Sequence, residues 1–238
     1  MAEWLVEIRG DVLDLAELQN LFNAPMLNVI KVGDTHFIRS TDFLELTSED
    51  EVRERGLALI DSLNGMARLC IGAFREISEA GVAARDERGN LRTFKFIGFD
   101  AILTQPRSSI HPVLSDGTTG PAFSPFQESV PKWITLARQQ KAVTDAFHFF
   151  RENSWFSLYK VYEIIRDDVG SHNLLEKKRW APDGDLNRFT GTAQSRAELG
   201  DLARHASHKY NPPKNPMTLA EATHLVKQLL LGWLASKK

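Results

Sequence analysis

The chain has 238 residues, of which 42% are hydrophobic and 25% charged, and its formal net charge is −2. This composition is ordinary for a folded cytosolic protein, and neither a low-complexity tract nor an internal repeat is present. No basic leader precedes an apolar stretch and no apolar segment is long enough for a membrane span, so the sequence predicts a cytoplasmic protein with no membrane partner. Its single cysteine, Cys70, excludes an internal disulfide and predicts a buried thiol.

The charge is divided unevenly along the chain. Residues 1–106 carry 11 Lys and Arg against 18 Asp and Glu, whereas residues 107–238 carry 18 against 13 and six of the seven histidines. A positive segment can attract phosphate or an acidic partner. The excess of five positive charges is mild for a nucleic-acid binder, so attraction between the two parts of the chain is the simpler interpretation.

The first strands and the first helix are predicted within residues 1–46. Trp4–Ile8 alternates between two faces and is typical of a strand, and Asp14–Phe22 has the apolar spacing of a short helix. Asn28–Val32 and Thr35–Arg39 flank Gly33-Asp34, which is typical of a tight hairpin. We expect Asp42–Leu46 to continue as extended chain.

A long helix and a second hairpin follow. Ser48-Glu49-Asp50-Glu51 has the pattern of a capping box and opens a helix with an apolar stripe up to Ile71. Glu79–Arg85 and Leu91–Ile97 flank a turn that ends in Gly89-Asn90. Residues 1–106 therefore predict an α+β domain, with a mostly antiparallel sheet and two helices on one of its faces.

Residues 107–127 are rich in Pro, Gly and Ser and predict a linker or long loop. Helical patterns follow over residues 128–238, which we expect to form an α-helical bundle domain. We expect one helix over Lys132–Glu152, a second from Trp155 to Asp168, less regular chain over 171–194 with a turn at 182–184, a polar helix over Ser195–His208, and a last helix that starts at the capping box Thr218–Glu221 and includes Trp233.

Several motifs of large enzyme classes are missing. The sequence has no Gly-rich phosphate loop, no Cys/His zinc pattern and no Gly-x-Ser-x-Gly elbow. It therefore predicts no cofactor.

The densest polar cluster contains Asp201, Arg204, His205 and His208. In a helix Asp201, His205 and His208 share one face. Arg204 with the histidines suits phosphate binding and proton transfer. Asp201 with the histidines supplies three metal ligands, which is an incomplete set. A solvated helix end that pairs with acidic residues is the plainest interpretation.

Glu163 and Tyr159 lie one turn apart on a helix that we expect to be largely buried. A buried carboxylate requires a partner, and Arg204 is our candidate for Glu163. A structural salt bridge between helices is the simpler interpretation of this pair than catalysis. The aromatic residues nearby are typical of a core, but Phe149, Phe150 and Phe156 cannot all face inward, so we expect an exposed apolar patch for a partner or a dimer.

Residues 130–238 resemble the HEPN superfamily, through a helical bundle of similar length, a late Arg/His pair and a final amphipathic helix. The family motif is an arginine, a polar residue and then a histidine, with four to six residues between Arg and His. Arg204 and His205 match its first two positions, and His208 follows after three intervening residues. Arg166 and His172 have five, but a Gly-Ser break at a helix end separates them, and we expect them to be held together less firmly. Residues 1–106 resemble no family.

The resemblance implies a module that binds RNA or a protein partner, as a homodimer, in a bacterial defence or stress system. Many members are ribonucleases that need no metal. By this resemblance Arg204 stabilises charge on the phosphate, and His205 or His208 acts as base or acid, with Glu163, Tyr159 and Asp201 in support. The alternative is a non-catalytic protein–protein interaction or assembly protein. A metal enzyme that uses Asp201 and the two histidines is a third interpretation.

Overall fold

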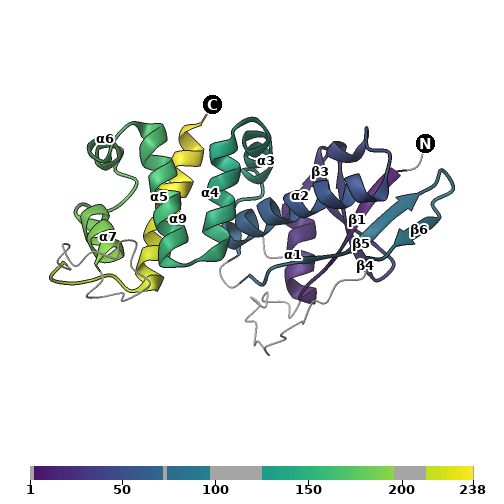
Figure 1. Ribbon diagram of the computed structural model, residues 1–238, viewed down its shortest axis with the longest axis horizontal. Helices are drawn as coiled ribbons and strands as arrows, with labels where there is room; N and C mark the ends of the chain where they lie inside the picture. The colour runs from purple at the N-terminus through teal and green to yellow at the C-terminus, as the bar shows by residue number, and fades with distance from the viewer. Residues whose placement is uncertain (1–2, 72–73, 97–124, 196–212, 238) are drawn as a thin grey trace, which may run out of the picture. The chain divides into compact units, whose positions relative to one another are not determined.

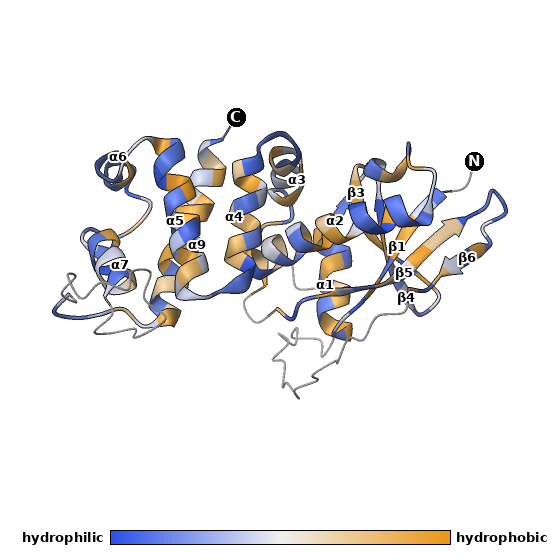
Figure 2. Cartoon of the chain, viewed as in Figure 1, coloured by the Kyte–Doolittle hydropathy of each residue, from blue (hydrophilic) through white to orange (hydrophobic). Residues whose placement is uncertain are grey.

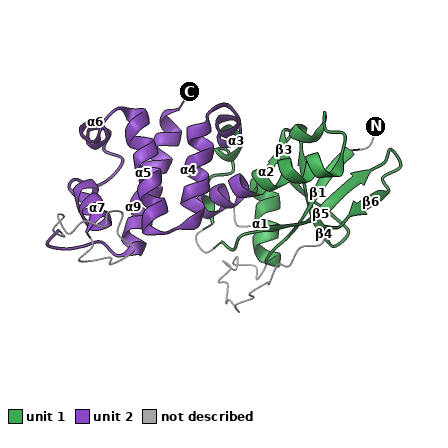
Figure 3. Ribbon diagram, viewed as in Figure 1, with its two compact units in different colours: residues 1–60, 70–132 green, residues 61–69, 133–238 purple. Residues whose placement is uncertain are grey.

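The computed structural model describes residues 3–71, 74–96, 125–195 and 213–237. The chain folds into two compact units (Figure 3). Unit 1 comprises residues 1–60 and 70–132, and unit 2 comprises residues 61–69 and 133–238. The predicted linker over 107–127 lies almost wholly outside the described residues, so the boundary between 1–106 and 128–238 stays a prediction.

Unit 1 is built on a six-stranded antiparallel sheet in the order β2-β3-β4-β1-β5-β6 (Figure 1). With the helical bundle described below, this sheet confirms the predicted α+β class. The elements that begin in unit 1 are β1 (Glu3–Arg9), α1 (Val12–Leu21), β2 (Asn23–Ala24), β3 (Leu27–Val32), β4 (Thr35–Ser40), the 3-10 helix η1 (Thr41–Phe43), α2 (Glu49–Cys70), β5 (Ser78–Arg85) and β6 (Leu91–Phe94).

The two faces of the sheet bury different apolar residues. Val6 faces α2 so closely that a Cβ atom on Gly56 would lie 2.6 Å from its side chain. Because side chains alternate along a strand, Leu5 points to the opposite face. There it forms a small buried cluster with Phe37 and Ala83. The strands are therefore apolar on both sides, and the second face also carries the polar residues discussed below.

Local signals predicted the turns of unit 1 well. The hairpin between β3 and β4 turns at Gly33, whose φ of 60° is in the left-handed region that favours glycine. The predicted capping box of α2 is confirmed, because Glu51 Oε2 accepts hydrogen bonds from the backbone N–H groups of Thr47 and Ser48. The extended chain predicted over 42–46 is wrong. The Ser40 hydroxyl accepts a hydrogen bond from the N–H of Asp42 and starts η1 instead.

Unit 2 is a bundle in which α5 packs against both α4 and α9 (Figure 1). Its apolar residues lie mainly on the inward sides of these helices (Figure 2). Among the described residues, no helix has the length and apolar character needed to cross a membrane. The helices are α3 (Val130–Gln139), whose first residues belong to unit 1, α4 (Lys141–Glu152), α5 (Trp155–Val169), α6 (His172–Lys177), α7 (Asp185–Gln194) and α9 (Leu219–Ser236).

Two expectations for the helices of unit 2 are wrong. The single helix predicted over 132–152 is two helices, because Gln140 takes an extended conformation and caps α4. The stretch over 171–194, expected to be less regular, contains α6 and α7. Ser171 caps α6 by accepting a hydrogen bond from the N–H of Leu174, and Gly184 starts α7 with a φ of 81°. The predicted turn at 182–184 and the break at Gly170 are confirmed.

Cys70 and the phenylalanines of unit 2 differ in how deeply they are buried. Cys70 ends α2 and is half-buried, not buried as predicted. Phe150 is buried, whereas the Phe156 side chain is more than half exposed, which confirms that these rings do not all face the core. The helix expected over 195–208 lies almost entirely outside the described residues.

Candidate functional site

The structure places only part of the predicted site. Asp201, Arg204, His205 and His208 lie outside the described residues, so their roles stay predictions. The two described members, Tyr159 and Glu163, are on α5.

Tyr159 is part of an aromatic core between α5 and α7. Its ring is stacked on that of Phe189 with centroids 6.0 Å apart, and it contacts Tyr162 edge to face at 5.3 Å. Its hydroxyl accepts a hydrogen bond of 2.7 Å from Gln194 Nε2. Tyr159 is therefore buried with its polar end satisfied, which is a structural role.

Glu163 is less buried than we expected, and its partners on its own helix can be named. Its carboxylate lies 3.2 Å from Lys160 Nζ and 3.9 Å from Arg166 Nη2. The side chain keeps 16% of its surface exposed. The proposed pairing with Arg204 is not tested, because Arg204 lies outside the described residues.

The best-defined polar network of unit 2 is centred on Tyr162, which is also on α5. Its hydroxyl oxygen lies 2.7 Å from Nδ1 of His172, at the start of α6. The Tyr162 ring is buried, and its edge packs against Phe189. His172 keeps 27% of its side chain exposed, so the network runs from the core to the surface.

The second ring nitrogen of His172 also has partners. Its Nε2 lies 3.1 Å from Asn187 Oδ1 and 3.4 Å from Glu176 Oε1. Asn187 Nδ2 in turn donates a hydrogen bond of 2.9 Å to Glu176. Because oxygen atoms face Nε2, the neutral ring carries its proton there and Nδ1 accepts from the phenol. The four side chains form one continuous hydrogen-bonded chain.

The ionisation of Tyr162 agrees with this assignment. Burial raises its pKa from 10.0 to about 12, with a further increase from Tyr159. The phenol therefore keeps its proton at neutral pH and is a donor toward Nδ1 of His172.

Arg166 approaches the same tyrosine from the last turn of α5. Its guanidinium carbon lies 5.7 Å from the centroid of the Tyr162 ring. A hydrogen bond of 2.6 Å to Asp167 raises the pKa of Arg166, which stays cationic. Arg166 and His172 thus contact one residue, although we expected the Gly-Ser break to leave them less firmly held.

The break itself produces this convergence. Gly170 ends α5 with a φ of 109°, a left-handed conformation that reverses the chain direction. Ser171 then caps α6 at once. His172, the first residue of α6, therefore lies beside Tyr162 on α5. Tyr162, Asn187 and Glu176 were missed as members of this network. Tyr162 lies four residues before Arg166 and Glu176 four residues after His172, and this helical spacing was a local signal for both pairs. Asn187 is 15 residues from His172, so only the fold brings it there.

Other contexts for the site are limited. Within the described ranges, no three His, Cys, Asp or Glu side chains are arranged to hold a metal ion. Comparisons of the chain with protein-family models, with curated proteins and with solved structures found no match.

Proposed function

We propose that unit 2 is a HEPN-like module that binds RNA and cleaves it without a metal, and that Arg166 and His172 belong to its site. The observation that carries this proposal is the convergence of both residues on Tyr162, with the five-residue spacing of the family motif between them. We place this activity in the cytoplasm, in a bacterial defence or stress system.

The chemistry requires a base, an acid and a group that stabilises charge on phosphate. His172, whose ring is partly exposed, takes the proton of the RNA 2′-hydroxyl. The 2′-oxygen then bonds to phosphorus and the bond from phosphorus to the 5′-oxygen breaks. The products are a 2′,3′-cyclic phosphate and a 5′-hydroxyl, whose proton comes from a general acid. Arg204, His205 and His208 remain our candidates for the acid and for further phosphate contacts.

Arg166 suits the stabilising role. Its guanidinium is permanently charged and matches the geometry of phosphate oxygens. Its present partner Asp167 is an exposed carboxylate, with 68% of its side chain accessible. An exposed ion pair contributes little stability. A phosphate group therefore displaces this partner at small cost.

The test is cleavage of a single-stranded RNA pool in EDTA by the full chain and its variants. Arg166→Ala and His172→Ala are each expected to slow cleavage by about 10²–10⁴-fold. The exposed residues Arg138 and His224 supply matched controls as Arg138→Ala and His224→Ala, which should cleave like the parent. Cyclic phosphate ends identify the reaction.

Two results would contradict the assignment. If the parent cleaves and both site variants cleave equally well, the site lies elsewhere. Loss of cleavage only in the combined Arg204→Ala, His205→Ala, His208→Ala variant would place it in that cluster.

A non-catalytic protein–protein interaction module is the second candidate. The exposed Phe156 on α5, with 53% of its surface accessible, favours it. No cleavage and no RNA affinity, together with salt-insensitive binding of a protein, would select this function.

A further inference from the structure

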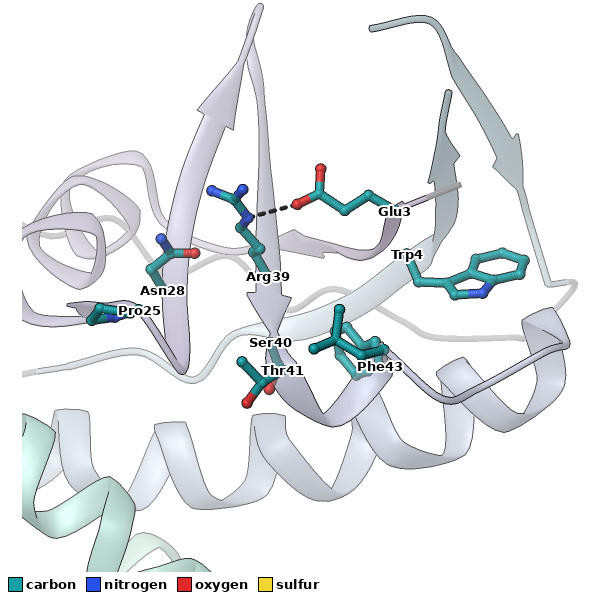
Figure 4. Close-up of a pocket in the computed structure, with 9 residues that line it drawn as sticks. Glu3, Trp4, Pro25, Asn28, Arg39, Ser40, Thr41 and Phe43 are labelled. Carbon is teal, nitrogen blue, oxygen red and sulfur yellow. Dashed lines mark hydrogen bonds and ion pairs between the residues drawn. The ribbon is translucent and has the colours of Figure 1, made fainter. Parts of the chain in front are cut away.

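Unit 1 contains a cavity of about 510 Å³ at one end of the sheet (Figure 4). This volume is in the range of small-molecule sites. Trp4, Pro25, Phe43 and Leu44 give the cavity an apolar wall, and the polar lining residues are Glu3, Asn28, Arg39, Ser40 and Thr41.

Three of the polar residues come from adjacent strands and share a face of the sheet. Asn28 on β3 is directly opposite Arg39 on β4. Val6 is paired with Ile38, so Glu3 on β1 points to the same face as Arg39. Figure 4 shows these three side chains on one side of the strands. Directly opposite residues have Cβ atoms about 5 Å apart, which places the amide beside the guanidinium.

Asn28 and Arg39 each have hydrogen-bonding atoms that a ligand can use. Within the described residues, the buried Oδ1 atom of Asn28 has no hydrogen-bond partner. In the same part of the chain, the Arg39 side chain donates through Nε to Glu3 Oε1 at 2.6 Å, which leaves the far end of the guanidinium for other acceptors. A buried acceptor without a partner costs free energy, and such groups are few in native proteins. The cavity therefore offers an acceptor and a cation to whatever enters it.

The charges around the cavity favour an anion. Glu3 forms ion pairs with both Arg39 and Arg85. Two guanidinium groups share one carboxylate, so one positive charge is left in excess. Of the two, Arg39 lines the cavity, and 47% of its side chain is exposed.

We propose that this cavity binds a small ligand in which a carboxylate or phosphate lies close to an N–H donor. The anionic group binds the free end of the Arg39 guanidinium, and the N–H group donates to Asn28 Oδ1. The apolar remainder packs against Leu44, which lines the cavity and keeps 69% of its surface exposed. This site is in unit 1 and does not depend on the function proposed for unit 2.

Two compounds carry an anionic group and an N–H donor, and they distinguish a carboxylate ligand from a phosphate ligand. N-acetylglycine carries a carboxylate beside an amide N–H, as a peptide C-terminus does, and phosphoethanolamine carries a phosphate two carbons from an ammonium N–H. Each is titrated into the 15N-labelled full chain, with acetate and inorganic phosphate as matched anions that lack the donor. We expect one of the two compounds to shift the Asn28 side-chain amide and to bind about tenfold more tightly than its bare anion.

Variants test the assignment of the residues. Arg39→Gln and the nearly isosteric Asn28→Asp, which places a negative charge opposite the anion, should each weaken binding at least about tenfold. Arg88→Gln, in an exposed turn of the same unit, should bind like the parent. The amide spectrum of each variant reports whether it is folded. The proposal is overturned if neither compound binds at millimolar concentration, if bare anions bind equally well, or if folded variants at 28 and 39 keep full affinity.

Discussion

At the residue scale, Tyr162 is the centre of the network that joins α5 to α6. Its hydroxyl has Nδ1 of His172 as a partner, and its ring lies under Arg166. Arg166 and His172, the two residues with the spacing of the family motif, are therefore brought together by Tyr162, which is not part of that motif.

Tyr162→Phe should cost about 1 kcal/mol of stability at neutral pH, since it removes one hydrogen bond and leaves the ring in place. Denaturant unfolding with comparison of midpoints measures this. A change in stability too small to resolve would indicate that the phenol contributes nothing to the fold.

The same variant tests the raised pKa. Above pH 10 the unfolded state releases the Tyr162 proton, whereas the folded state holds it until about pH 12. The unfolded state therefore binds fewer protons, and the stability from this group falls as pH rises through that window. We expect the parent to lose more stability between pH 10 and 12 than Tyr162→Phe does. Parallel losses would show that the pKa is not raised.

At the element scale, close packing of α2 against α4 requires glycine at position 65. A Cβ atom there would lie 2.3 Å from the backbone oxygen of Phe147, which cannot move aside as a flexible side chain can. Gly65→Ala should therefore destabilise the chain by about 1–3 kcal/mol, although alanine is the better helix former. Leu57→Ala, at an exposed position of the same helix, should change stability by about 0.5 kcal/mol or less. A neutral Gly65→Ala would mean that α4 is not packed this closely.

The start of α9 depends on the charge of Glu221. The N–H of Thr218 and the guanidinium of Arg188 both donate to this carboxylate and lower its pKa from 4.5 to about 2. The stabilisation is present above pH 4.5 and is lost as pH falls toward 2. Glu221→Gln should lower the melting temperature at pH 7 and flatten its acid dependence in that window. Glu54→Gln, an exposed glutamate on α2, is the control and should retain the parent profile.

The other end of α9 is held by Trp233, which is fully buried and donates through Nε1 to Asp168 Oδ2 at 2.8 Å. Trp233→Ala should cost about 3–5 kcal/mol, as large-to-small changes in a core do. Chemical denaturation measures it. A loss below about 1 kcal/mol would show that α9 is peripheral to the bundle.

At the scale of the whole molecule, the helix α2 contributes residues to both units. Residues 61–69 of α2 group with the C-terminal helices, and Asp61 Oδ1 accepts a hydrogen bond of 2.6 Å from Arg151. The fragment 128–238 lacks this segment. We expect it to unfold at a lower temperature and less cooperatively than unit 2 does in the full chain, as followed by circular dichroism. An equally cooperative transition would show that the bundle folds without α2.

The sequence by itself determined the features that local contacts decide. Gly33-Asp34 turned the first hairpin, and the boxes at Ser48 and Thr218 started α2 and α9, because the groups that form these motifs lie within four residues of one another. The mostly antiparallel sheet followed by a helical bundle came from the same signals.

The tertiary structure decided what depends on residues far apart in the chain. No glycine or proline near Gln140 marks the end of α3 in the sequence. Tyr162 contacts His172 because Gly170 reverses the direction of the backbone. The cavity at Asn28 and Arg39 likewise exists because strand register sets an amide beside a guanidinium. Register and chain reversal place side chains by packing across elements, which no short stretch of sequence encodes.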